Sequence, residues 1–217
     1  MFDPSFTIAD ILSLILTIAA TYIAVMEYRR SSRETKEEEE RKKGIHSILN
    51  KLSSIDSLYD DFESFSNGVS TVYPHVRKMS PDNPSSWSNG QLQLAGMLLG
   101  RFHSNIEKAL QNTETNKNGA LKELYEILLQ YEDRFSMSYG YNRYIEVLGG
   151  FFLAKDNLAD LNKRLDAFIK KITSGEVIGP ADMVDMLSEC YKTTNEYLIS
   201  LQKTAFAVNE LKLKYPK

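Results

Sequence analysis

Residues 180–214 read PADMVDMLSECYKTTNEYLISLQKTAFAVNELKLK, a long amphipathic segment near the end of the chain. Its apolar and small side chains recur every three or four residues, the spacing that places them on one face of an α-helix. Pro180 suits the first helical turn, where a missing backbone N–H costs nothing. The stripe consists of Met183, Leu187, Cys190, Tyr191, Thr194, Tyr197, Leu198, Leu201, Ala205, Val208 and Leu211. We therefore predict one helix over this length that packs against others.

The same spacing recurs in the segments that precede it. It predicts helices at about 45–65, 94–110, 121–135 and 142–172, the last stopped by Gly175. No segment shows a convincing strand-like alternation of apolar and polar residues. Long helices with short connections favour antiparallel packing. The predicted fold class is therefore all-α, with an antiparallel helical bundle of about five long helices over 45–217.

One interruption of this bundle is rich in turn-forming residues. Asn67-Gly68 opens it, and Pro74, Pro81 and Pro84 follow among several serines. Proline and glycine at this density favour turns over regular structure. We predict a mobile Pro/Ser-rich loop at about 67–89.

The start of the chain has a different character. Residues 6–26, FTIADILSLILTIAATYIAVM, contain 16 apolar or aromatic residues out of 21, and their only charge is Asp10. As a helix this stretch is about 31 Å long, close to the ~30 Å hydrocarbon core of a bilayer. We predict a single transmembrane helix at 6–28 after a short extracytoplasmic N-terminus at 1–5.

Three other interpretations of the segment are weaker. A cleaved signal peptide needs a basic start and a small-residue cleavage site, and no Lys or Arg precedes Arg29. A helix in the core of a soluble protein usually has a polar face. A helix lying in the membrane interface needs a strongly charged face. The sequence shows neither kind of face here.

Charges beside the span predict its orientation. Arg29, Arg30, Arg33 and Lys36 follow it, whereas no base precedes it. Lys and Arg near a span favour the cytoplasmic side. We therefore expect a single-pass protein of the cell membrane with its N-terminus outside and its C-terminal domain in the cytoplasm.

Two features of the span suggest association in the membrane. Small residues three or four apart define an association face: Ala9, Ser13, Thr17, Ala20 and Ala24. Such residues let helices approach closely in lipid, although they are also common in spans generally. Asp10 is a candidate intramembrane acid, and such acids are often functional.

The segment at 29–44 is predicted to be a charged helical stalk. Seven bases and six acids lie between Glu27 and Lys43, with no apolar stripe. Three Glu side chains each precede a base by four residues, a favourable arrangement on a helix, as in Glu38 and Lys42. An alternative role is binding to anionic lipids through the first bases, although the near-zero net charge of the whole stretch limits this to local contact.

The sequence contains few of the patterns that mark catalytic, metal or nucleic-acid sites. The net charge of −3 offers no basic field for nucleic acid, and one Cys allows no internal disulfide. His46, His75 and His103 belong to no metal-binding pattern, and no phosphate-binding loop or nucleophile elbow occurs. Cys190 falls on an apolar stripe, where a buried thiol is the expected role. We expect no cofactor, no metal and no enzymatic activity.

Aromatic residues supply the candidate partner contacts. Trp87 lies in the predicted loop, where it either folds back onto the bundle or anchors a partner. A second group surrounds the step Gly149-Gly150 and forms either core or a groove for a partner. This group consists of Tyr139, Tyr141, Tyr144, Phe151 and Phe152.

These features favour a membrane-anchored helical protein that acts by binding. Its expected partners are the bilayer, itself, and another membrane or cytoplasmic protein. Two rival hypotheses stay open. One is a membrane-disrupting or channel-related effector whose bundle controls association of the spans, and the other is a helical enzyme whose scattered residues form no recognisable motif.

Overall fold

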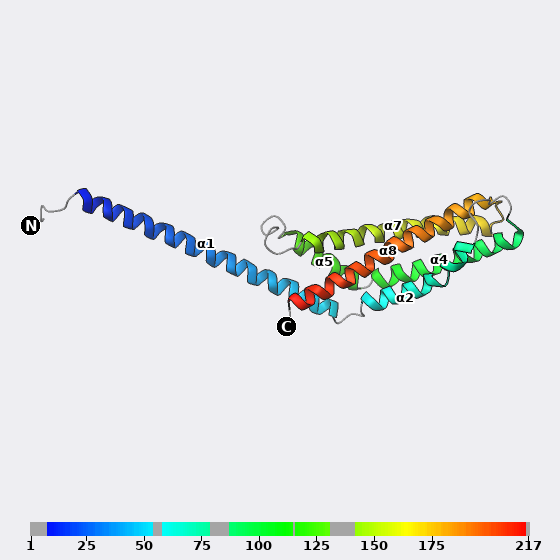
Figure 1. Cartoon of the computed structure of the whole chain (residues 1–217), viewed down its shortest axis with the longest axis horizontal. Coiled ribbons are helices and arrows are strands. Elements are labelled where there is room, and N and C mark those ends of the chain that lie inside the picture. The colour runs from blue at the N-terminus through cyan, green and yellow to red at the C-terminus, as the bar shows by residue number, and fades with distance from the viewer. Residues whose placement is uncertain (1–7, 54–57, 79–86, 115, 131–141, 216–217) are drawn as a thin grey trace, which may run out of the picture. The chain divides into compact units, whose positions relative to one another are not determined.

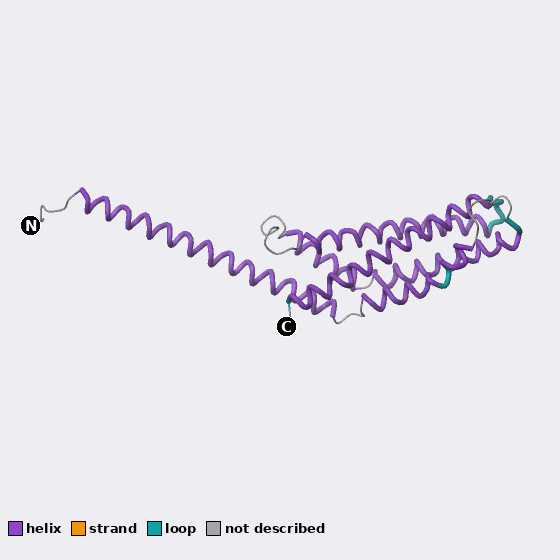
Figure 2. Tube along the Cα trace, viewed as in Figure 1, coloured by secondary structure: helices purple, strands orange, loops and turns teal. Residues whose placement is uncertain are grey.

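A computed structural model describes residues 8–53, 58–78, 87–114, 116–130 and 142–215. The chain divides into two compact units, Met1–Gly44 and Ile45–Lys217, which we describe separately. The boundary falls where the predicted stalk ends. Every regular element in the described ranges is a helix (Figures 1 and 2), so the predicted all-α class is confirmed for them.

The helices have the following bounds. They are α1 (Ile8–Ser53), α2 (Leu58–Ser70), α3 (Tyr73–Lys78), α4 (Asn89–Glu114), α5 (Asn116–Gln130), α7 (Asn142–Thr173) and α8 (Pro180–Lys214). The predicted stalk lies wholly inside α1, and α4, α7 and α8 each cover a segment predicted to be helical.

Helix α8 is the element around which the second unit packs. It contacts α7 along its length and also packs against α2 and α4. Figure 1 shows α7 and α8 running antiparallel, side by side. The apolar stripe predicted from the sequence is the buried face, with Cys190, Tyr197 and Leu211 fully enclosed. Phe102 of α4 and Phe151 of α7 join them in one continuous hydrophobic core.

A tight turn connects α7 to α8. Gly175 has a φ of 82°, a left-handed conformation that other residues adopt only at a cost. The N–H of Glu176 donates to the carbonyl of Lys171 (3.1 Å), and the N–H of Gly175 donates to that of Ile172 (3.2 Å). This pair of bonds is a Schellman motif, so the predicted stop at Gly175 is confirmed.

Three sequence-based boundaries were wrong. The helix predicted at about 121–135 begins earlier, at Asn116 of α5, and its residues 131–135 lie outside the described residues. The apolar stripe at 45–65 was predicted as one helix, but α1 ends at Ser53 and α2 begins at Leu58. The loop predicted from residue 67 is also narrower, since α2 continues to Ser70 and α3 occupies Tyr73–Lys78. Pro74 fits the first turn of α3, where proline is tolerated, and therefore does not mark a loop. Residues 79–86 of that prediction lie outside the described residues.

The predicted transmembrane helix has no support from the described structure. Over the described ranges, no helix combines the length and the apolar character that a bilayer crossing requires. Residues 6 and 7, and the side chains of 8–15, lie outside what is described.

Gly68 shows why a glycine is acceptable inside α2. The amide of Asn105 on α4 donates to the Gly68 carbonyl (2.9 Å). A Cβ at residue 68 would lie 2.9 Å from Oδ1 of the same Asn105. The missing side chain therefore lets α4 approach α2 closely enough for this hydrogen bond. Gly100 on α4 differs, because a Cβ there would meet nothing within 4 Å.

We predict opposite responses to alanine at these two glycines. Gly100→Ala should raise the free energy of unfolding by up to about 1 kcal/mol, the difference in helix propensity between the two residues. Gly68→Ala should lose this gain, and fall below wild type, because Asn105 must move and give up its hydrogen bond. Urea denaturation of both variants measures the difference. Equal stabilisation by the two substitutions would contradict the close approach of α2 and α4.

Candidate functional site

The predicted association face lies on the first turns of α1. Thr17, Ala20 and Ala24 are exposed, and the Thr21 hydroxyl donates to the Thr17 carbonyl (2.8 Å). Ala9, Asp10 and Ser13 lie on the same helix, but their side chains are outside the described part of the structure. Large apolar side chains on the other sides of the same turns are also exposed: Leu16, Ile18, Tyr22, Ile23, Val25 and Met26.

The four bases predicted to set the topology are all exposed on α1. Arg30 forms an ion pair with Glu34 (3.0 Å). Further along the stalk, Lys42 pairs with Glu38 (2.7 Å), as the sequence spacing predicted. Exposed pairs of this kind add a few tenths of a kcal/mol to the helix. Most of the stalk is exposed, but Arg41 near its end is an exception and is buried, with only 2% of its surface exposed.

Trp87 belongs to the bundle core and is only 9% exposed. Of the two roles considered for it, this placement favours folding back onto the bundle over an exposed anchor for a partner. A large aromatic side chain gains most of its hydrophobic free energy when it is covered, which explains why the chain turns inward here.

The aromatic group near Gly149-Gly150 is core in the part that the structure describes. Phe151 is fully buried, and Tyr144 and Phe152 pack partly buried against the core. Tyr139 and Tyr141 lie outside the described residues. Phe151 therefore does not line a groove for a partner, because its ring is enclosed by the neighbouring helices. The centre of the Phe151 ring lies 5.6 Å from the ring centre of Phe152 and 6.0 Å from that of Tyr197.

Two tyrosines outside the predicted aromatic group complete this cluster. The hydroxyl of Tyr125 on α5 would lie 3.3 Å from a Cβ at Gly149, so the glycine makes room for the tyrosine. The Tyr125 ring also lies 5.7 Å from Phe152. Tyr197 of α8 contacts Phe65 of α2 edge to face, at 5.4 Å between ring centres. Their positions depend on which helices are neighbours, which periodicity does not reveal.

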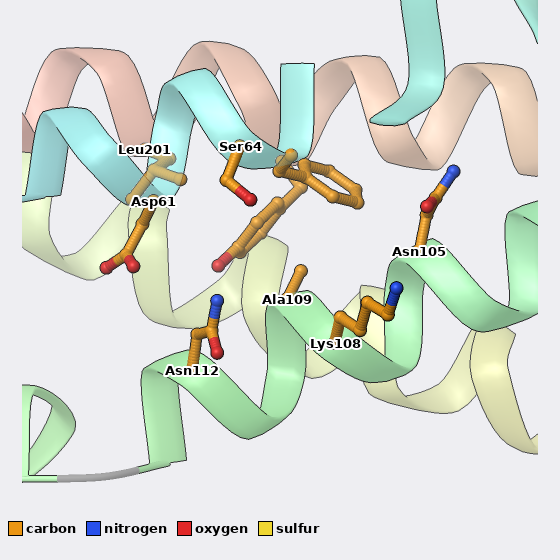
Figure 3. A pocket seen from close by; sticks show the side chains of 9 residues that line it. Asp61, Ser64, Asn105, Lys108, Ala109, Asn112 and Leu201 are labelled. Atoms are coloured by element: carbon orange, nitrogen blue, oxygen red, sulfur yellow. The ribbon is translucent and has the colours of Figure 1, made fainter. Parts of the chain in front are cut away.

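A small cavity with both polar and apolar lining residues lies where α2, α4 and α8 meet. Figure 3 shows Asp61 and Ser64 on α2 opposite Lys108, Ala109 and Asn112 on α4. Its volume is about 30 Å³. That is room for about two water molecules, whereas sites for small organic ligands measure roughly 300–1,000 Å³. The cavity is lined by Asp61, Ser64, Phe65, Asn105, Lys108, Ala109, Asn112, Tyr197 and Leu201.

A buried ion pair stands at the edge of this cavity. Nζ of Lys117 on α5 donates to Oδ2 of Asp61 at 2.8 Å, with side chains only 5% and 10% exposed. The acidic cluster Asp60, Asp61 and Glu63 by itself predicts a solvated face. For Asp61 this prediction is wrong, because Lys117 covers and neutralises its carboxylate. The two residues are 56 positions apart, so no local spacing could have paired them. The pair joins α2 to the first turn of α5.

Cys190 is buried in α8, as the sequence predicted. Burial raises the pKa of its thiol to about 12, so it stays neutral and unreactive at physiological pH. Beside it, the Thr194 hydroxyl donates to the Cys190 carbonyl (2.6 Å) and lies 2.9 Å from the Tyr73 hydroxyl of α3. Burial raises the pKa of Tyr73 as well, only partly offset by that hydrogen bond. This chain of polar groups fastens α3 to α8.

Within the described ranges, no three His, Cys, Asp or Glu side chains converge closely enough to hold a metal ion. Comparison with known proteins identified no matching protein family, no similar curated protein and no similar solved structure.

We predict that breaking the buried pair destabilises the bundle strongly. Lys117→Met leaves the Asp61 carboxylate buried without its cation, at a cost of about 3–5 kcal/mol in the free energy of unfolding. The double variant Lys117→Met with Asp61→Leu should recover most of this loss, because no buried charge remains. Chemical denaturation followed by circular dichroism measures both effects.

An exposed ion pair provides the control. Lys51 and Glu123 lie 2.8 Å apart, but their side chains are 56% and 51% exposed. Lys51→Met should therefore change stability by less than about 1 kcal/mol. A Lys117→Met variant as stable as Lys51→Met would contradict the burial of the Asp61–Lys117 pair.

Proposed function

We propose that this chain is a single-pass protein of the cell membrane whose cytoplasmic helical bundle works by binding. It recruits or scaffolds a partner at the membrane, as a homo-oligomer or as a subunit of a larger membrane complex. The observation that carries the proposal is the exposed apolar surface of α1. Leu16 is 68% exposed, and Ile18 and Ile23 are comparably open. Contiguous apolar surface of this kind needs lipid or protein to cover it.

The segment before Leu16 extends this surface in the sequence. The residues at 6–26 form one apolar run, and α1 begins at Ile8 within it. Bases follow on one side only, which supports a cytoplasmic bundle under the positive-inside rule. The cavity between α2, α4 and α8 is too small for a metabolite, and its size supports binding through surfaces rather than turnover.

The first test places charges in the apolar segment. Leu16→Lys with Ile23→Lys adds two bases, each costing about 2.5–3.5 kcal/mol at the centre of a span. In cells, wild type should remain in the membrane fraction after a carbonate wash, and this variant should move to the soluble fraction. The matched control is Ile199→Lys with Leu213→Lys, which changes two exposed apolar residues of α8 and should stay in the membrane.

Protease treatment of intact cells tests the orientation in the same samples. A tag at the C-terminus should survive in intact cells and be cut after lysis. Release of wild type by carbonate would remove the anchor, and cleavage of the tag in intact cells would reverse the orientation.

Association through the small-residue face is tested by cross-linking. Ala24→Cys lies on that face, whereas Tyr22→Cys lies on the opposite side of α1, because residues rotate by about 100° each. Mild oxidation of membranes should give disulfide dimers of the first variant and few of the second. Wild type supplies the baseline, since its only thiol is buried. Equal cross-linking at both positions would argue against a specific face. If cross-linking and solubilisation of the membranes capture no specific partner of the chain, the binding function is contradicted.

A further inference from the structure

The bases that follow the proposed span lie on one side of α1. Because each residue turns the helix by about 100°, Arg29, Arg33 and Lys36 fall within an arc of about 60°. Arg30 lies about 60° further round. All four side chains are exposed. The helix therefore carries a basic side, defined as Arg29, Arg30, Arg33 and Lys36.

The acids of the same stretch are set apart from this side. Glu27 and Glu34 lie more than about 100° from the centre of the arc formed by Arg29, Arg33 and Lys36. Glu34 is occupied by its ion pair with Arg30, at the edge of the basic side. Its centre thus presents positive charge without an acid beside it in these two turns.

Charge is also sorted along the axis of α1. Residues 27–36 contain four bases and two acids, whereas 37–43 contain four acids and three bases. The basic side is only about 10 Å long, at 1.5 Å per residue. The Debye length in physiological salt is about 8 Å. A charged surface at Arg29 therefore acts most strongly on Arg29, Arg30 and Arg33, whereas Lys36 and the acids from Glu37 onwards lie more than a Debye length away.

Tyr22 extends the basic side towards the span. It lies seven residues before Arg29, which is nearly two full turns, and its ring is 66% exposed. Tyrosine is common where hydrocarbon meets headgroups, because its ring is apolar and its hydroxyl is polar. The small-residue face points the other way, about 170° around the helix. A helix packed on that face would leave the basic side turned towards lipid.

We propose that the basic side binds the anionic phospholipid headgroups of the cytoplasmic leaflet and fixes the rotation of α1 about its own axis. This inference rests on the membrane anchor proposed above and adds the class of lipid. Guanidinium and ammonium groups donate hydrogen bonds to phosphate and carboxylate, and clusters of four or more bases beside a span favour anionic lipids. Tyr22 marks the depth at which these contacts begin.

The test uses the full chain in vesicles of phosphatidylcholine alone or mixed with phosphatidylserine. Electron paramagnetic resonance of spin-labelled lipids measures which lipid the protein holds at its surface. Wild type should prefer phosphatidylserine by about fivefold or more, the contribution of a single base near the surface. Arg29→Gln with Arg33→Gln should lose most of this preference. Raising the salt to 1 M, where the Debye length is about 3 Å, should weaken it in wild type.

The matched control removes the same charge further along the stalk. Lys42→Gln with Lys43→Gln should keep the lipid preference, because both residues lie beyond the basic side. No preference in wild type, or an equal loss in the control, overturns the inference while leaving the anchor intact. A wild-type chain that a carbonate wash strips from both kinds of vesicle overturns the anchor as well.

Discussion

The packing of α8 against α2, α4 and α7 is the constraint on which the second unit depends. One face of a single long helix supplies Tyr197, Leu201 and Leu211 to the core, and three other helices close over it. Burying such side chains contributes about 1.5–3 kcal/mol each, which is far more than any surface ion pair of this chain contributes. The helices around α8 are packed closely enough to require glycine at two positions. Gly68 lets α4 approach α2, and Gly149 makes room for Tyr125 of α5.

Polar contacts inside this core link particular pairs of helices. Asp61 and Lys117 join α2 to α5, and Thr194 links α3 to α8 through Tyr73. A buried ion pair adds little net stability over a well-packed apolar pair, but a wrong alignment leaves its charges unpaired. Such contacts therefore select one arrangement of helices among several that would bury similar apolar area.

The spacing of apolar residues was sufficient to predict the features that depend on a single helix. The fold class, the extents of α4, α7 and α8, the stop at Gly175 and the burial of Cys190 all follow from local spacing or local turn chemistry. Periodicity predicted neither the end of α1 at Ser53 nor the helix α3. Pro74 was misleading because proline suits a turn and a first helical turn equally. Trp87 and Phe151 became core residues, and Asp61 gained Lys117, through neighbours that are distant in the sequence. The role proposed for the surface of α1 involves lipid rather than a contact within the chain, so only hydropathy and charge bear on it.

The turn between α7 and α8 bears on how the chain folds as it is synthesised. The two helices are joined by only a few residues, so bringing them together costs little loop entropy, and such local contacts form early. Yet α8 follows α2 and α4 in the chain, so it leaves the ribosome after both of them. Until Lys214 emerges, the apolar faces of α2 and α4 have no α8 to cover them. A premature stop within α8 would leave those faces uncovered and open to aggregation.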